Sequence, residues 1–85
     1  METFTYTLKD GVGIHARPAG LIVNLAKNYE SEINVEKGGK GASAKKLMAL
    51  MSLGVKRGET VIVSAQGADE AAAISAMEEF FKANL

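Results

Sequence analysis

The sequence predicts an α+β fold in which a mostly antiparallel sheet carries its helices on one face. Short segments alternate apolar and polar residues, which is the period of a strand buried on one side only. Between them lie stretches with the three- and four-residue apolar spacing of a helix. The pair Gly38-Gly39 joins two alternating segments as a hairpin, a connection typical of antiparallel strands. We therefore expect the order β-α-β-β-α-β-α in a single domain over residues 1–85.

The first strand is expected over residues 3–8, where Phe4 and Tyr6 share one face and threonines occupy the other. A glycine-containing loop follows at residues 9–13. Helical spacing then begins at Pro18, a residue that suits a first helical turn because amides there lack intrahelical partners. The expected buried stripe of this helix is Pro18, Leu21, Ile22, Leu25, Ala26 and Tyr29.

The remaining elements follow the same two periods. Strands are expected at residues 32–37, 40–42 and 60–65. Helices are expected at residues 45–53 and 70–83. Ser43 and Asp69 are the expected N-caps of these two helices, and Gly54 is the expected stop of the first. Ile62 is the one large apolar residue predicted to lie on the open face of the sheet.

The helix at residues 45–53 is apolar on almost every side, which exceeds what one thin core can cover. Leu50 and Leu53 are the natural inward pair. Leu47, Met48 and Met51 then share an exposed face, although such residues on an isolated helix are more often core. The shortage of core favours a surface for protein partners, since methionine adapts to several of them.

Residues 14–20, Ile-His-Ala-Arg-Pro-Ala-Gly, hold the only histidine and the only proline of the chain. If the helix begins here, His15 lies just outside its N-terminus and Arg17 lies in its first turn. The unpaired amides and the positive end of the helix dipole favour an anion. A neutral imidazole is a nucleophile near pH 7, and a guanidinium binds phosphate oxygens. These residues together predict a phosphoryl group carried on His15.

The composition of the chain argues against several classes of function. Ten basic and ten acidic residues cancel, so no overall field favours nucleic acid or an anionic membrane. No cysteine and one histidine argue against a metal site, and no cofactor is implied. With no signal peptide and no apolar run of ~18 residues, we expect a cytoplasmic protein without membrane insertion. Residues 11–16 match G-x-G-x-x-A, but a nucleotide-binding domain rests on that weak pattern alone.

With these stretches in view, the chain resembles the HPr family, the histidine-containing phosphocarriers of the bacterial phosphoenolpyruvate-dependent sugar phosphotransferase system. The resemblance lies in Ile-His-Ala-Arg-Pro-Ala, in Leu-Met-Ala-Leu-Met-Ser-Leu-Gly-Val at residues 47–55, and in length. It implies an open-faced β-sandwich, a four-stranded antiparallel sheet with three helices on one face. It also implies a carrier that is itself covalently phosphorylated and is not an enzyme.

By this resemblance, His15 accepts a phosphoryl group on Nδ1 from enzyme I and donates it to the IIA components of sugar permeases. Arg17 and the start of the helix, Ala16, Arg17 and Pro18, would hold the phosphoryl group. The expected partner-binding residues are Gly20, Asn24, Lys27, Leu47, Met48 and Met51. The protein is expected to act as a monomer.

Position 46 departs from the family. Many relatives carry a serine there that a regulatory kinase phosphorylates, whereas this chain has Lys46, which cannot accept phosphate. A regulatory protein-binding module of the same fold, not dedicated to sugar uptake, is the alternative function. The intact His15 and the missing hydroxyl at position 46 both argue against it.

Overall fold

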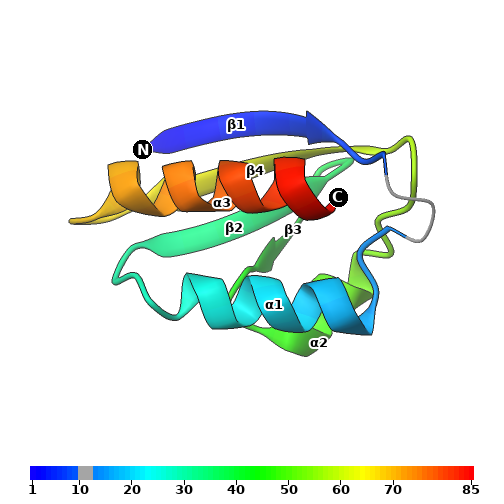
Figure 1. Cartoon of the computed structure of the whole chain (residues 1–85), viewed down its shortest axis with the longest axis horizontal. Helices are drawn as coiled ribbons and strands as arrows, with labels where there is room; N and C mark the ends of the chain where they lie inside the picture. The colour runs from blue at the N-terminus through cyan, green and yellow to red at the C-terminus, as the bar shows by residue number, and fades with distance from the viewer. Residues whose placement is uncertain (10–12) are drawn as a thin grey trace.

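The computed structural model describes residues 1–9 and 13–85. It shows a four-stranded antiparallel sheet with three helices on one face, in the predicted order (Figure 1). The elements are β1 (Glu2–Thr7), α1 (Ala16–Ala26), β2 (Glu32–Lys37), β3 (Lys40–Ser43), α2 (Leu47–Ser52), β4 (Thr60–Gln66) and α3 (Glu70–Asn84). The α+β open-faced sandwich is thereby confirmed. Within the described ranges, none of the helices has the length and hydropathy needed to cross a membrane.

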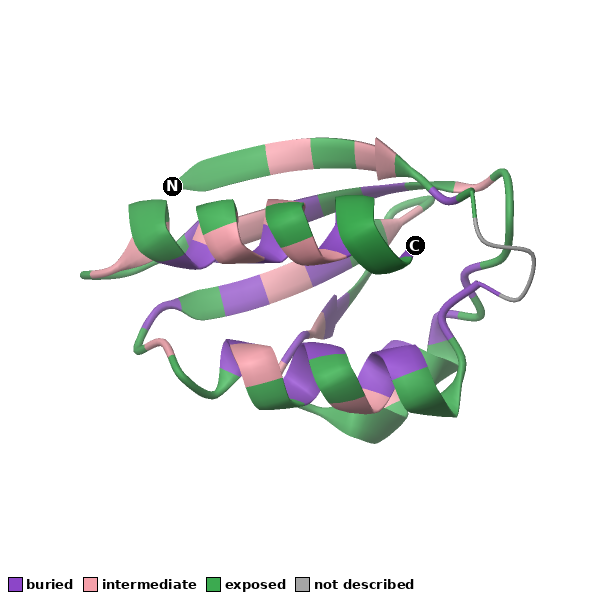
Figure 2. Ribbon diagram, in the orientation of Figure 1, coloured by how far each residue is buried: buried purple, intermediate pink, exposed green. Residues whose placement is uncertain are grey.

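The sheet has the order β1-β4-β2-β3, so the last strand of the sequence lies in its interior. In β4, Val61, Val63 and Ala65 face the helices and are fully buried. Ile62 lies between Thr5 and Glu36 on the open face and is exposed, as predicted. One side of the sheet is therefore core and the other is solvated (Figure 2).

Phe81 of α3 is the largest fully buried side chain. Its ring meets those of Phe4 and Tyr6 edge to face, with centroids 5.6 Å and 5.8 Å apart. Such pairs contribute ~0.5–1.5 kcal/mol each beyond the area they bury. They fix α3 against β1, so the C-terminal end of α3 has a defined place near the start of α1 (Figure 1).

The buried side of α1 differs from the prediction. Pro18, Ile22 and Ala26 are buried as expected, but Leu21 is 44% exposed, and Leu25 and Tyr29 are only partly buried. Ala19 and Val23 take their places in the core. The core side of α1 is therefore rotated toward Ala19 and Val23, which leaves Leu21 outside it.

The second helix is shorter than predicted. Lys46 has extended backbone angles, φ -122° and ψ 110°, so α2 begins after it and the predicted residues 45–46 are not helical. Ser43 is not the N-cap; its hydroxyl accepts a hydrogen bond from the Lys45 amide, 3.2 Å away. Gly54 has φ 61° directly after the C-cap Leu53, and it stops the helix as predicted.

Asp69 stands at the N-cap position of α3, yet its side chain does not cap that helix. The carboxylate instead accepts hydrogen bonds from the amides of Glu30 and Ser31, both at 2.9 Å, and from the Ser31 hydroxyl. The predicted N-cap position of Asp69 is confirmed, but the predicted capping hydrogen bond of its side chain is wrong. The reason is that residues 30–31 offer three donors to the same carboxylate.

Candidate functional site

His15 is the N-cap residue of α1, with extended backbone angles of φ -111° and ψ -167°. Its carbonyl accepts the first hydrogen bond of the helix from the Ala19 amide, 2.9 Å away. Its side chain is exposed and makes no capping hydrogen bond. The backbone of His15 therefore serves the fold, while its imidazole projects to solvent.

The segment before His15 is fixed to the loop between α2 and β4. The Ile14 amide donates to the Val55 carbonyl at 3.0 Å, and the Ile14 side chain is buried. Gly13 has φ 77° and lies so close to Val55 and Lys56 that a Cβ there would collide with their backbone. The contacts of Gly13 and Ile14 with Val55 thus determine where the chain enters α1.

A depression of about 230 Å³ adjoins the imidazole. Its lining comes from both ends of the chain: His15, Arg17, Pro18, Leu21 and Asn84. Sequence reasoning missed Leu21 and Asn84. The helical spacing places Leu21 in the buried stripe, and no periodicity or motif of the sequence brings residue 84 to residue 15.

The end of α3 is also held at this place. The Leu85 side chain is buried, and an oxygen of Leu85 accepts a hydrogen bond of 2.6 Å from the Lys9 amide. The Asn84 amide group donates to the Phe80 carbonyl at 3.0 Å. The guanidinium of Arg17 is exposed, and no carboxylate in the described ranges forms an ion pair with it.

The first turn of α1 presents donors beside the imidazole. The amides of Ala16 and Arg17 have no backbone acceptor among the described residues. Pro18 has no N–H, so its part is to fix the backbone, and its ring is buried. Two amides, a guanidinium and the positive end of an 11-residue helix form an environment in which an anion is stabilised.

The predicted partner-binding residues lie on α1 and α2, which pack beside each other (Figure 1). On α1, Gly20 is partly exposed and Asn24 is exposed, and Lys27, the C-cap residue of this helix, is exposed as well. On α2, Leu47, Met48 and Met51 are 40%, 72% and 37% exposed, whereas Leu50 beneath them is buried. These exposed residues thus belong to two helices in contact, and His15 directly precedes the first of them.

A family model described as the PTS HPr component phosphorylation site matches residues 2–83. The chain belongs to the HPr family. Members of this family are phosphocarriers of the phosphotransferase system and act as phosphoryl carriers, not as catalysts.

Solved structures agree with the family model. HPr from Thermoanaerobacter tengcongensis is 43% identical, with a TM-score of 0.93 over 98% of this chain and 93% of its own. HPr from Bacillus anthracis is 30% identical, with a TM-score of 0.87 over 94% of this chain and 95% of its own. The Bacillus subtilis catabolite repression protein Crh, a dimer with a swapped domain, is 36% identical, with a TM-score of 0.79 over 94% and 92%.

The glycine pattern at residues 11–16 lies only partly within the described residues. Gly11 and Val12 lie outside the described residues. The sheet is antiparallel, whereas the dinucleotide fingerprint belongs to a parallel, doubly wound sheet. The sheet is therefore not the fold that this fingerprint needs, and the pattern gives no support to the nucleotide-binding alternative.

Proposed function

We propose that this protein accepts a phosphoryl group on His15 from phosphorylated enzyme I and donates it to the IIA components of sugar permeases. The observation that carries the proposal is the exposed imidazole at the start of α1, which the fold does not use, in a chain of the HPr family. The partners of such a carrier act in the cytoplasm, and we expect this protein there as a single domain.

The transfer follows from the chemistry of the site. The lone pair of neutral Nδ1 attacks phosphorus, a P–N bond forms, and the bond between phosphorus and the donor breaks, with its electron pair staying on the donor. Arg17 and the first-turn amides stabilise the oxygens as charge builds on them. The second transfer runs the same way, with His15 as leaving group. Alignment and charge stabilisation are the main requirements of phosphoryl transfer, so a small carrier suffices.

Gly20, Asn24 and Lys27, together with the apolar residues of α2, form the proposed docking surface. Donor and acceptors must use it in turn, which requires a modest and transient interface. The exposed methionines support this because their flexible side chains fit different partners. We expect the protein to dock as a monomer, which light scattering would test, since Crh forms a swapped dimer.

The likeness to Crh favours a second candidate, a regulatory binding module. Lys46 at the start of α2 is exposed but has no hydroxyl. Regulation by a kinase at this position is therefore not part of the proposal. A module that docks without carrying phosphate would still fold and bind, and it would not need His15.

Incubation with phosphoenolpyruvate and enzyme I separates the two candidates. We expect acid-labile, alkali-stable phosphate on the wild type and none on His15→Ala. Arg17→Ala should be labelled at a rate lower by roughly 10- to 100-fold, because one preorganised cation is lost. An unlabelled wild type beside a competent enzyme I would contradict the carrier function. Labelled His15→Ala would contradict the site.

A further inference from the structure

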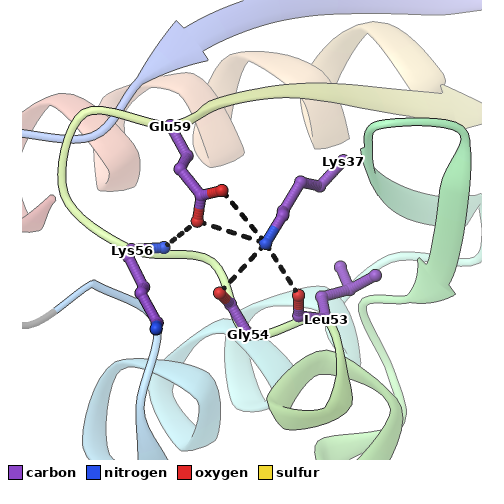
Figure 3. A network of polar contacts seen from close by, with 5 residues as sticks. All are labelled: Lys37, Leu53, Gly54, Lys56 and Glu59. Carbon is purple, nitrogen blue, oxygen red and sulfur yellow. Dashed lines mark hydrogen bonds and ion pairs between the residues drawn. The ribbon is translucent and has the colours of Figure 1, made fainter.

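Lys37, the last residue of β2, connects three segments that are distant in sequence. Its ammonium donates to the carbonyl oxygens of Leu53 at 3.3 Å and Gly54 at 3.1 Å, at the end of α2 (Figure 3). It also meets the Glu59 carboxylate, with 3.1 Å to each oxygen. Lys37 is only 29% exposed at its side chain, so solvent screens these contacts less than those of an open surface pair.

Glu59 is held on a second side. The Lys56 amide donates to its carboxylate at 2.8 Å, and the Glu59 amide donates to the Lys56 carbonyl at 3.1 Å. The hydrogen bond from Lys56, followed by that from Lys37, lowers the pKa of Glu59 below its usual value. Residues 53–59 therefore close around the ammonium, as Figure 3 shows.

This closed loop contains Val55, the residue that fixes the entry to α1. Its carbonyl accepts the Ile14 hydrogen bond, and its backbone leaves no room for a side chain at Gly13. The loop is tied to the end of β1 as well, because the Gly58 amide donates to the Leu8 carbonyl at 2.9 Å. A continuous set of contacts thus runs from Lys37 to the residue preceding His15.

We propose that Lys37 is a positioning residue for phosphoryl transfer at His15. The ammonium neutralises Glu59 and satisfies two carbonyls at the end of α2, and so it holds Val55 where Ile14 needs its acceptor. Lys37 does not touch the phosphoryl group. It sets the direction in which α1 begins, to which an in-line transfer is sensitive at the level of ~1 Å. The proposal rests on the function proposed above for His15.

Lys37→Met tests the proposal, and Lys40→Met is the matched control. Lys40 is the cross-strand partner of Lys37, carries the same charge, and is exposed without a hydrogen bond or ion pair from its side chain to described residues. Two readouts are needed: hydrogen exchange of the Ile14 amide, and the kinetics of phosphorylation by enzyme I with phosphoenolpyruvate. We expect faster exchange at Ile14 in Lys37→Met and a maximal rate lower by about tenfold, with little change in KM.

Lys40→Met should match the wild type in both the exchange of the Ile14 amide and the rate of phosphorylation. Lys37→Arg should be faster than Lys37→Met, because arginine keeps charged donors at this place. If Lys37→Met is poorly folded, Glu59→Gln loosens the same loop while the lysine remains. It should slow transfer less than Lys37→Met does.

Several results would overturn the role of Lys37. The first is an unchanged maximal rate in Lys37→Met and in Glu59→Gln. The second is equal acceleration of exchange at Ile14 and at the core residues Val63 and Met77, which indicates general loosening. The third is an equal loss of rate in Lys40→Met. If the wild type accepts no phosphate, the function of His15 fails together with this inference, whereas equal rates in wild type and Lys37→Met contradict only the inference.

Discussion

The two ends of the sandwich are held in different ways. At the end where α3 begins, the Asp69 carboxylate binds two amides and a hydroxyl, and the N-terminal ammonium lies 2.9 Å from Glu70. At the end where α1 begins, the imidazole of His15 and the guanidinium of Arg17 have no such partners in the described ranges. That end is held instead by the backbone hydrogen bond from the Ile14 amide to the Val55 carbonyl.

This difference teaches how a small domain can keep reactive groups free. Polar side chains at the Asp69 end are consumed by hydrogen bonds that stabilise the fold. Polar side chains at the His15 end are available to a ligand or partner. Backbone hydrogen bonds and Lys37 hold the chain there, so the fold does not need those side chains. Removal of a polar side chain should therefore lower stability at the Asp69 end and slow transfer at the His15 end, whereas a change to the backbone contacts of the His15 end should affect stability as well.

Gly13→Ala should have the largest effect on stability, because it disrupts the close contact between residue 13 and Val55 that holds the His15 end. Its φ of 77° disfavours any side chain, and the new Cβ meets the backbone of Val55 and Lys56. We expect the free energy of unfolding to fall by roughly 2–3 kcal/mol, measured by urea denaturation. The control is Gly38→Ala, with φ 55° and open space around it, which should cost only ~1 kcal/mol. Equal costs would show that Val55 does not constrain residue 13.

Asp69→Asn should lower the melting temperature by ~5 °C, because Ser31 and Glu30 lose a charged acceptor. Calorimetry at pH 7 measures the change. Hydrogen bonds from the Ser31 hydroxyl and the Glu30 amide lower the pKa of Asp69 below 3.8, its ordinary value.

The pH dependence sharpens the same prediction. A carboxyl with a lowered pKa in the folded state adds stability that is present above its unfolded pKa and is lost as pH falls through the folded value. The difference between wild type and Asp69→Asn should therefore be full above about pH 5 and shrink below pH 4. Glu59 and Glu70, whose pKa values are also lowered, contribute equally to both proteins. A constant difference down to pH 2 would contradict the role of the Asp69 charge.

Met48→Asp should separate docking from folding at the His15 end. Met48 is the most exposed residue of the α2 patch, so the fold should keep its melting temperature. A charge in an apolar contact should weaken docking, so the KM of this protein as a substrate of phosphorylated enzyme I should rise by roughly tenfold. Ile62→Asp is the matched control, because Ile62 is an exposed apolar residue on the open face of the sheet. A loss of folding in Met48→Asp, or an equal rise of KM in Ile62→Asp, would refute the docking surface.

Lys46→Ser should have the smallest effect. Lys46 is exposed at the start of α2, and its charge would favour an acidic partner surface. We expect enzyme I to bind a few-fold more weakly, with a reduced dependence on salt, as for a screened surface charge. Lys40→Ser removes the same charge from β3 and should leave the salt dependence unchanged. An unchanged salt dependence in Lys46→Ser would show that this charge plays no part in docking.

The sequence predicts local features better than distant ones. Strand periods and the change of period at residues 14–20 predicted every element, and the exposure of Leu47, Met48 and Met51 followed from the small core. Contacts between distant segments escaped prediction. Asp69 was expected to cap its own helix because the sequence does not show that residues 30–31 lie opposite it.

The site followed the same rule. His15 and Arg17 are neighbours of Pro18, so their place at the helix start could be predicted. Asn84 joins them through contacts between distant segments, namely the packing of Phe81 on β1 and the hydrogen bond from Lys9 to Leu85. Lys37 looks like an ordinary strand end in the sequence, and only the folded chain shows its contact with Gly54 and Glu59. The helical spacing places Leu21 in the buried stripe, whereas in the folded chain Ala19 and Val23 are buried and Leu21 is exposed.

The separation of transfer from stability is tested most directly by the rate at which phosphorylated enzyme I phosphorylates Asp69→Asn, at a temperature where variant and wild type are both folded. The two sites lie at opposite ends of the sandwich, so their effects should be independent, and the rate should agree with the wild type within about twofold. Arg17→Ala, measured beside it, should be slow with an unchanged melting temperature. A rate for Asp69→Asn as low as that of Arg17→Ala would contradict the separation.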